Sequence, residues 1–289
     1  MDAFTREYIG LAAETMESMH AGVDWISCTL GSEAKLRWEW ANTCVECLME
    51  ISREGHKIGD FGVNGYRGVM VGGSFVGNRE DSTYCQIAGR YADTYLERIM
   101  RPDVHVSRLD VAVTVQFRTM PNRLGELSYG LAVEADRDQS PSRHRKIWFM
   151  SGSDHGYTLY IGSPSSEQRG RMYNKEVQSG VPEYSRSWRY EVVYKNDLAT
   201  NAYNIIGGTP QIERPGVCAD IVEVWYRRRG VVCPWSHKND ISIKPQIAEN
   251  PSDAQRKLKW LQKQVRPAVQ WLIENNYRED ALDALGIGE

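Results

Sequence analysis

Charged and phenolic side chains share one face of a short segment around residue 173. In Arg171-Met172-Tyr173-Asn174-Lys175, the alternation of a β-strand places Arg171, Tyr173 and Lys175 on the same side. A tyrosine oxygen can attack a phosphodiester, and neighbouring cations stabilise the phenolate that does so. Free tyrosine has a pKa of about 10, so at pH 7 the phenolate is disfavoured by roughly 4 kcal/mol. These three residues are therefore candidate catalytic residues for phosphoryl chemistry.

Two carboxylates follow the same strand rule. Asp110 shares a face with Arg108, and Glu191 shares a face with Arg189 and Lys195. Carboxylate oxygens are hard ligands, so Asp110 and Glu191 are candidate ligands of Mg²⁺ or Mn²⁺, which would polarise a phosphate. Any one of these strand faces is also typical of a solvated surface with cross-strand salt bridges. Three such faces together favour a catalytic site over a solvated surface.

A sheet is expected to position these residues. Residues 105–117 alternate strictly between apolar and polar side chains, which is typical of a half-buried strand. Glycine-punctuated hairpins are expected up to residue 88, with further strands at 23–30, 145–151, 156–162, 169–174 and 186–195. Helices are expected at about 1–20, 33–54, 122–135, 196–206, 217–227 and 253–276. The sequence thus predicts an α+β fold: a large, mostly antiparallel sheet with helices packed on one face and a helical C-terminal region.

The chain of 289 residues is long enough for one large domain or two joined ones. We expect a catalytic domain over residues 1–206 and a helical C-terminal extension over 207–289 packed on it, with a soft boundary. No internal repeat is visible. The net charge of -3 argues against a protein that coats nucleic acid without selectivity, although it allows a local basic site.

Cysteine usage and hydropathy indicate a reduced, soluble protein. The six cysteines are scattered, and Cys44 and Cys47 fall on the apolar stripe of the helix expected at 33–54, which favours core packing over a metal site. No segment reaches the roughly 18 apolar residues of a membrane span, and the first residues lack a secretory pattern. We therefore expect a cytoplasmic protein without a membrane partner.

Other chemical motifs fit less well. The glycine-rich run at 72–79 lacks the Lys and the Ser or Thr of a phosphate-binding loop, and all six histidines are isolated. Four other tyrosines are rival nucleophiles: Tyr160, Tyr184, Tyr190 and Tyr194. Tyr190 and Tyr194 lie on the apolar side of their strand, which makes them weaker candidates. Three tryptophans are candidates for stacking unpaired bases: Trp148, Trp188 and Trp235.

Four segments follow one another in a distinctive order and spacing: Arg108-Leu109-Asp110-Val111-Ala112-Val113, Thr158-Leu159-Tyr160-Ile161-Gly162-Ser163, Arg171-Met172-Tyr173-Asn174-Lys175 and Trp188-Arg189-Tyr190-Glu191-Val192. Together they resemble the replication initiation factor family of rolling-circle replicons, often called Rep-trans. The resemblance starts near Asp24-Trp25-Ile26-Ser27 and extends to about residue 200. That family includes plasmid initiators, filamentous-phage replication proteins and relaxases of some integrative elements.

The resemblance implies a site-specific enzyme that nicks and rejoins one DNA strand. Tyr173 would become joined to the 5′-phosphate and leave a 3′-hydroxyl, with Asp110 and Glu191 at the metal-binding positions and Arg171 and Lys175 as cationic neighbours. The family's first acidic strand commonly carries a second Asp where this chain has Thr114. The residues expected to bind DNA are Arg108, Ser163, Arg189, Lys195, the run Arg227, Arg228 and Arg229, and the ridge Arg256, Lys259 and Lys263.

The expected partners are origin DNA with a hairpin or single-stranded nick site, and a host helicase and DNA polymerase; a homodimer is left open. Nothing in the chain resembles an ATPase, so unwinding must come from another protein. Three alternatives stay open: a relaxase of an integrative conjugative element, a non-enzymatic origin-binding protein or repressor, and a metal-dependent phosphodiesterase that uses water. The arginine-rich ridge is also typical of a solvated helix face.

Overall fold

The structure, a computed structural model, describes residues 3–31, 33–139, 146–152, 156–236, 239–244, 261, 265–275 and 277–279. The strands are β1 (Met16–Leu30), β2 (Ile58–Val63), β3 (Tyr66–Val71), β4 (Ser74–Asn78), β5 (Thr83–Ala88), β6 (His105–Phe117), β7 (Ile147–Gly152), β8 (Gly156–Ile161), β9 (Gln168–Asn174) and β10 (Ser187–Lys195). The helices are α1 (Ala3–Glu14), α2 (Ala34–Ser52), α3 (Arg90–Ile99), α4 (Leu124–Gln139), α5 (Lys175–Ser179), α6 (Asp197–Gly207), α7 (Arg214–Arg227) and α9 (Arg266–Glu274), with a 3₁₀ turn η1 (Pro182–Tyr184).

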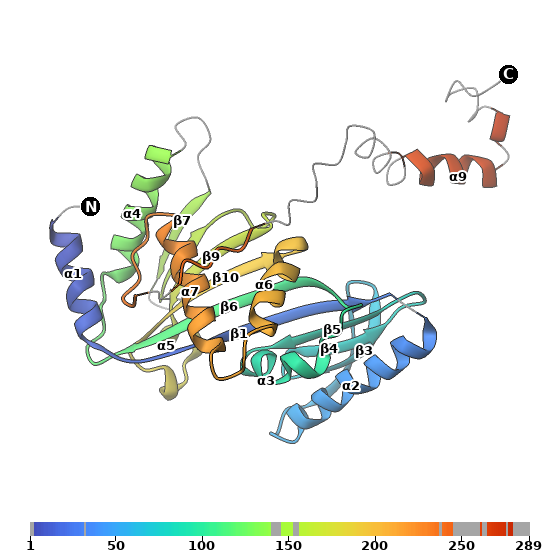
Figure 1. The fold of residues 1–289 in the computed structure, drawn as a ribbon, viewed down its shortest axis with the longest axis horizontal. Coiled ribbons are helices and arrows are strands. Elements are labelled where there is room, and N and C mark those ends of the chain that lie inside the picture. The colour runs from blue at the N-terminus through green and yellow to red at the C-terminus, as the bar shows by residue number, and fades with distance from the viewer. Residues whose placement is uncertain are drawn as a thin grey trace. The chain divides into compact units, whose positions relative to one another are not determined.

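All ten strands form one sheet in the order β2-β3-β4-β5-β1-β6-β10-β9-β8-β7. Every neighbouring pair is antiparallel. The long strands β1 and β6 pair at the centre, and β10 and β9 follow on one side (Figure 1). The predicted α+β class with a large antiparallel sheet is confirmed.

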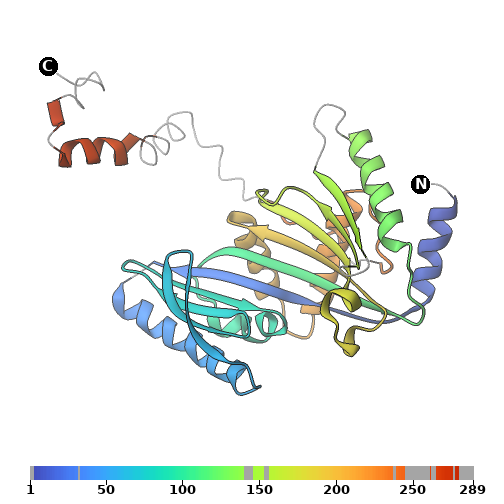
Figure 2. The same ribbon diagram turned by 180° about the vertical axis from the view of Figure 1, so that it is seen from behind.

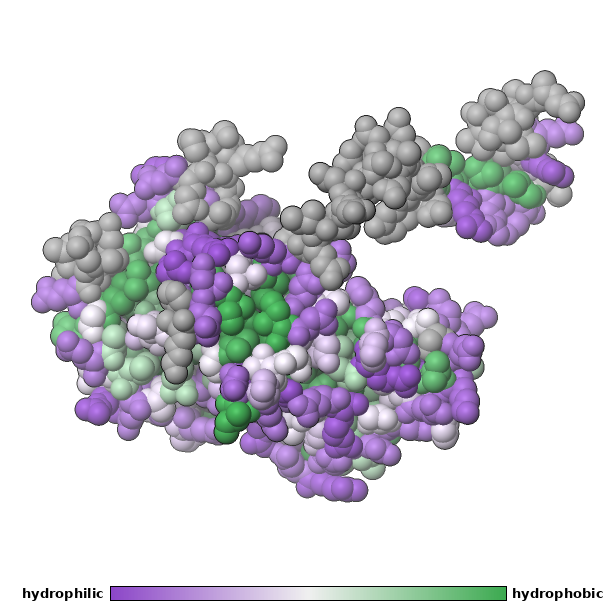
Figure 3. All heavy atoms as spheres, in the orientation of Figure 1, coloured by the Kyte–Doolittle hydropathy of each residue, from purple (hydrophilic) through white to green (hydrophobic). Residues whose placement is uncertain are grey.

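The two faces of the sheet differ as strand alternation requires. On β6, Leu109, Val111, Val113 and Val115 are fully buried on one face. Helices α2, α3, α4, α6 and α7 contribute to the same apolar core as this face, and Figure 1 shows them in front of the sheet. In the space-filling view of this side, hydrophilic atoms cover most of the outer surface and hydrophobic atoms gather near the centre (Figure 3).

The opposite face of the sheet, seen in Figure 2, is called the open face below. The segment from α5 to η1 lies on this side, next to β9 and β10. Tyr66 of β3, Phe75 of β4 and Tyr84 of β5 form a small second core, separate from the helix-covered core. The polar side chains of β6, β9 and β10 point to the open face.

The two halves of the sheet share one order of elements, a repeat that the sequence did not reveal. In the first half β1 leads into α2, then the four strands β2 to β5, then α3. In the second half β6 leads into α4, then the four strands β7 to β10, then α6. In each half the first strand pairs with the last, and the two first strands pair with each other. The sheet is therefore two similar halves joined along β1 and β6.

Two elements differ from the sequence-based expectation. Residues 16–20 belong to β1 and not to the first helix, because this end of the strand pairs with β6. No element was expected at 90–99, where α3 forms with Tyr91, Ala92, Tyr95, Leu96 and Ile99 buried. The expected helix stripe with Cys44 and Cys47 is confirmed as a buried face of α2. All six cysteines are free and buried.

The chain divides into two compact units, Met1–Pro245 and Gln246–Glu289. Helix α7 belongs to the first unit. Helix α9 belongs to the second unit and has Pro267 in its first turn. The boundary expected at residue 206 stays a prediction. Among the described residues, no helix combines the length and apolarity that crossing a membrane requires.

Candidate active site

The register of the sheet brings the candidate catalytic residues together on the open face. Tyr173 of β9 pairs with Arg189 of β10, and Arg189 pairs with Thr114 of β6. In the adjacent row Arg171 pairs with Glu191. Paired residues on one face lie about 5 Å apart, so the side chains of three strands can interact directly.

Glu191 is the centre of this cluster. Its side chain is fully buried, and its carboxylate accepts hydrogen bonds from Arg171 Nη2 at 2.5 Å and from the Tyr173 hydroxyl at 3.4 Å. Burial alone would raise the pKa of Glu191, but the charges of Arg171 and Arg189 outweigh it, so the pKa lies below the usual value. Glu191 is therefore held as a carboxylate in contact with the phenol.

Asp110 has the opposite preference. Arg108 donates to both of its oxygens, at 2.8 Å and 2.5 Å. Burial nevertheless raises the pKa of Asp110 to about 7, with Arg108 opposing the shift and the neighbouring Glu191 charge adding to it. The two carboxyl groups therefore favour a state in which Glu191 is charged and Asp110 keeps its proton up to about pH 7.

Tyr173 is only 7% exposed. Burial and the Glu191 charge raise the pKa of Tyr173 above its usual value, although Arg189 and Arg171 lower it. Arg171 and Lys175 lie 5.7 Å and 5.8 Å from the ring centre. The two cations thus do not ionise this phenol by themselves, and its proton needs an acceptor. Burial and Arg189 lower the pKa of Lys175.

Asp24 is a site residue that the sequence analysis missed. It forms an ion pair with Arg189, whose Nη1 also donates to Thr114 Oγ1 at 3.2 Å. The available signal was its place at the start of Asp24-Trp25-Ile26-Ser27, the segment where the family resemblance begins. Thr114, the departure from the family pattern, therefore helps to hold an arginine.

Two predicted DNA-binding residues lie at the end of β8 and β10. Lys195 Nζ donates to the Pro164 carbonyl at 2.6 Å, and Ser163 Oγ bonds Ser165 Oγ at 2.9 Å. These bonds stabilise the turn between β8 and β9. Lys195 pairs with Arg108 across β10 and β6, so it stays on the open face, at its edge.

The arginine run at the end of α7 lies on the other side of the sheet. Helix α7 packs there through Tyr226, whose ring contacts Tyr190 on the apolar face. Arg227 and Arg228 pair with Asp240, and Arg229 stacks on Trp225 at 3.6 Å. The structure therefore does not bring this run to Tyr173. Three further candidates fall outside the described residues: Arg256, Lys259 and Lys263.

The cluster has the donor chemistry for a hard divalent ion. Within the described ranges no group of three or more His, Cys, Asp or Glu side chains is arranged to hold a metal. Asp110 and Glu191 supply oxygens only, and burial, together with the neighbouring Glu191 charge, disfavours the ionised Asp110 that a bound cation would stabilise. Two carboxylates completed by water and a substrate phosphate suit Mg²⁺ or Mn²⁺.

An open sheet face carrying a tyrosine, paired acids and arginines defines a class of protein suited to phosphodiester chemistry. Residues 104–214, from just before β6 to the start of α7, match the Rep_trans family, described as Replication initiation factor. The resemblance inferred from the sequence is thereby confirmed for this segment, which makes up less than half of the chain. It contains Asp110, Tyr173 and Glu191 but not Asp24.

Similarity to other proteins is distant. No curated protein matches the chain. A rolling circle replication initiator protein from Geobacillus stearothermophilus is 19% identical, with a TM-score of 0.45 over 66% of this chain and 80% of that chain. A putative C-terminal regulatory domain of aspartate kinase from Porphyromonas gingivalis W83 is 15% identical, with a TM-score of 0.18 over 49% of this chain and 83% of that chain. The family assignment depends on the match of residues 104–214 alone.

Proposed function

We propose that the chain initiates rolling-circle replication by nicking and rejoining one strand of origin DNA through Tyr173. One observation carries the proposal: the Tyr173 hydroxyl bonds the Glu191 carboxylate beside Asp110 and two arginines, within the segment that matches the initiator family. Such a site has a nucleophile, a proton acceptor and cations for the phosphate.

The geometry supports a specific order of proton transfer. As the Tyr173 oxygen attacks phosphorus, its proton passes to Glu191, to which the hydroxyl already donates. Neutral Glu191 no longer holds Arg171 as an ion pair, so that guanidinium can turn to the negative phosphate. The bond from phosphorus to the 3′-oxygen breaks, and the 3′-oxygen leaves as a hydroxyl after taking a proton from solvent water. Attack by a 3′-hydroxyl on the phosphotyrosine reverses these steps and rejoins the strand.

Asp110 and Glu191 would hold the metal ion before the attack, and Asp110 together with the substrate phosphate would hold it once Glu191 has taken the proton. When bound, Mg²⁺ or Mn²⁺ supplies positive charge that polarises the scissile phosphate. Lys175 and Arg189 lie next to the Tyr173 ring and would bind the phosphates of the DNA strand electrostatically. A helicase and a polymerase of the host would extend the freed 3′ end. A relaxase of a conjugative element would use the same chemistry.

A second candidate function is non-enzymatic binding of origin DNA, as a repressor or marking protein. It is favoured by the ion pairs that already occupy all three carboxylates, those of Asp24, Asp110 and Glu191. Thr114 stands where the family commonly has an acid and binds Arg189 instead. Such a site would bind phosphates without breaking them.

A covalent trap separates these functions. The chain is incubated with a random pool of single-stranded DNA and Mn²⁺, denatured, and analysed for a protein–DNA adduct and for cleaved DNA. We expect an adduct on the peptide that contains Tyr173, lost in Tyr173→Phe and retained in Tyr157→Phe, a tyrosine of β8 that packs on Phe149 of the other face. An adduct that survives Tyr173→Phe would contradict the assignment. Cleavage without an adduct would indicate hydrolysis by water, and binding without cleavage would support the second candidate.

A further inference from the structure

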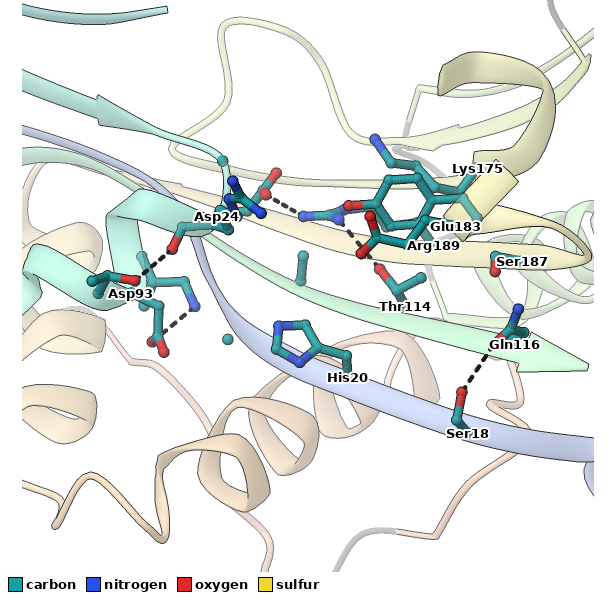
Figure 4. Close-up of a pocket in the computed structure, with 17 residues that line it drawn as sticks. Ser18, His20, Asp24, Asp93, Thr114, Gln116, Lys175, Glu183, Ser187 and Arg189 are labelled. Carbon is teal, nitrogen blue, oxygen red and sulfur yellow. Dashed lines mark hydrogen bonds and ion pairs between the residues drawn. The ribbon is translucent and has the colours of Figure 1, made fainter. Parts of the chain in front are cut away.

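A polar cavity adjoins the candidate active site on the open face. Its volume is about 560 Å³, within the range of sites that bind small molecules. Its walls come from β1, β6, the first turn of α3 and the chain from α5 to β10 (Figure 4). Lys175 and Arg189 line it and also flank Tyr173, so the cavity and the candidate active site share a border.

Two small residues explain why the sheet is hollow here. Glu191 pairs with Ala112 on β6, and Ala112 pairs with Gly22 on β1. Ala112 and Gly22 form the floor of the cavity. Ala112 is one strand away from Glu191, and Gly22 is two strands, or about 10 Å, away from Glu191. A Cβ on Gly22 would meet the Asp93 carboxylate at 3.4 Å, so a larger side chain would fill the space.

The side of the cavity nearest Tyr173 carries two cations, Arg189 and Lys175, together with the carboxylates of Asp24 and Glu183. The Arg189 side chain is 9% exposed and its Nη atoms bond Asp24 and Thr114, while its Nε has no partner among the described residues. A buried guanidinium nitrogen without a partner is costly. Lys175 lies on the same side.

The far side of the cavity offers an acceptor and a ring. Asp93 accepts the Val23 backbone N–H at 3.4 Å through Oδ1, and no ion pair of the described chain engages it. His20 is exposed on β1 and projects into the cavity opposite Thr114 (Figure 4). Carboxylates accept hydrogen bonds from the amino groups of bases, and histidine rings stack on unpaired bases.

We propose that this cavity binds one unpaired nucleotide of the nicked strand, close to the scissile phosphate. The nucleotide's phosphate lies toward Arg189 and Lys175, its base lies over Gly22 and Ala112 beside His20, and its exocyclic amino group donates to Asp93. Adenine, cytosine and guanine carry such a group and thymine does not, so the cavity selects against thymine at one position. The assignment of this nucleotide to a nicked DNA strand rests on the proposed function.

The test is a selection of single-stranded DNA from a random pool by the full chain carrying Tyr173→Phe, which binds without bond formation. We expect a bound motif with one position depleted of thymine at least fivefold. In the same chain, Asp93→Asn should remove that depletion, because an amide can also donate to the thymine carbonyl. His20→Ala should weaken binding of the selected DNA about fivefold or more, as loss of one stacked base does. Asp60→Asn, an exposed acid of β2, is the matched control and should leave the motif unchanged.

The outcomes separate this inference from the proposed function. Thymine depletion that survives Asp93→Asn would overturn the cavity assignment, even if the wild-type chain forms the Tyr173 adduct. Depletion that depends on Asp93 in a chain that never forms the adduct would support the cavity and overturn nicking. Free deoxyadenosine monophosphate that binds as tightly as the selected strand, and competes with it, would overturn assignment to a strand and indicate a free nucleotide ligand.

Discussion

Asp110 and Glu191 are neighbours with opposite protonation preferences, and their surroundings explain the difference. Glu191 faces Arg171 and is affected by Arg189, whereas Asp110 has Arg108 alone and lies against the Glu191 charge. One proton between two acids is a common way to accommodate like charges in a buried site. At the level of residues, the site is therefore set up either to keep that proton or to exchange it for a cation.

The raised pKa of Asp110 makes stability depend on pH. Its folded pKa of about 7 exceeds the usual 3.8, so between about pH 4 and pH 7 the unfolded chain loses a proton that the folded chain keeps. This contribution to the free energy of unfolding is complete below pH 4 and is lost as pH rises through 7. Asp110→Asn should remove this loss, so its free energy of unfolding should depend less on pH between 4 and 8 than that of the wild type. Urea unfolding from pH 4 to pH 8 measures it, with Asp60→Asn as control; parallel curves for the wild type and Asp110→Asn would contradict the assignment.

Metal binding should compensate the same charge. Mn²⁺ needs the ionised carboxylates, so it should raise the Tm of the wild type at pH 8 and do so much less at pH 5. Asp110→Asn should lose most of this response at both pH values. Thermal unfolding with and without EDTA gives the measurement. An equal response in the variant would place the ion elsewhere.

At the scale of elements, the register of the strands brings residues that are far apart in the sequence next to one another in the candidate active site. The four segments that carried the family resemblance lie on β6, β8, β9 and β10, and antiparallel pairing puts their alternate residues on one face. Alternation alone therefore predicted which residues share a side. It could not predict Asp24, because a bulge in β1 between Val23 and Trp25 interrupts the pattern at that residue.

Other elements were predictable to different degrees. Apolar residues at three- and four-residue spacing identified α2, and the same spacing in α3, from Tyr91 to Ile99, was available but unused. Residues 16–20 of β1 are mostly exposed, so no burial pattern marks them as a strand. The cavity required coordinates, since it depends on which small residues of β1 and β6 become neighbours.

The packing of α7 on β9 gives a stability prediction. A Cβ on Gly170 would lie 2.4 Å from the Trp225 ring, so Gly170→Ala should destabilise the fold by about 1–3 kcal/mol. Gly130 in α4 has no atom within 4 Å of an added Cβ, so Gly130→Ala should stabilise by about 1 kcal/mol through helix propensity. Chemical denaturation of both variants compares them. Equal effects would show that α7 does not pack closely on β9.

Strands β7 and β8 carry an aromatic pair in line with the candidate active site. Trp148 stacks on Tyr160 with ring centres 4.9 Å apart, and Tyr160 pairs with Arg171. Trp188 is fully buried and Trp235 nearly so, which leaves Trp148 as the tryptophan suited to stacking on bases. Trp148→Ala should weaken binding of single-stranded DNA about five- to hundredfold. Fluorescence titration measures it, with Trp38→Ala, an exposed tryptophan of α2, as the control; similar losses in both would contradict a specific stack.

For the whole molecule, the first compact unit contains every residue of the cluster and the helices that cover the sheet. A chain of residues 1–245 should therefore unfold cooperatively and form the Tyr173 adduct. It lacks Arg256, Lys259 and Lys263, so its affinity for duplex DNA should fall less steeply with salt, the slope of log K changing by about 2 to 3. Salt titrations of both chains test this. An unchanged slope would remove the three residues from the DNA contact.

The seam between β1 and β6 constrains how this protein can be divided. The family match covers only the half that contains Asp110, Tyr173 and Glu191, yet that half begins with a thirteen-residue strand whose other edge is paired with β1. Cut free, it would present a long unsatisfied edge that pairs with any available strand, first of all with the same edge of an identical copy. The amino-terminal half thus acts as a permanently tethered partner, taking the place that a second subunit would otherwise fill.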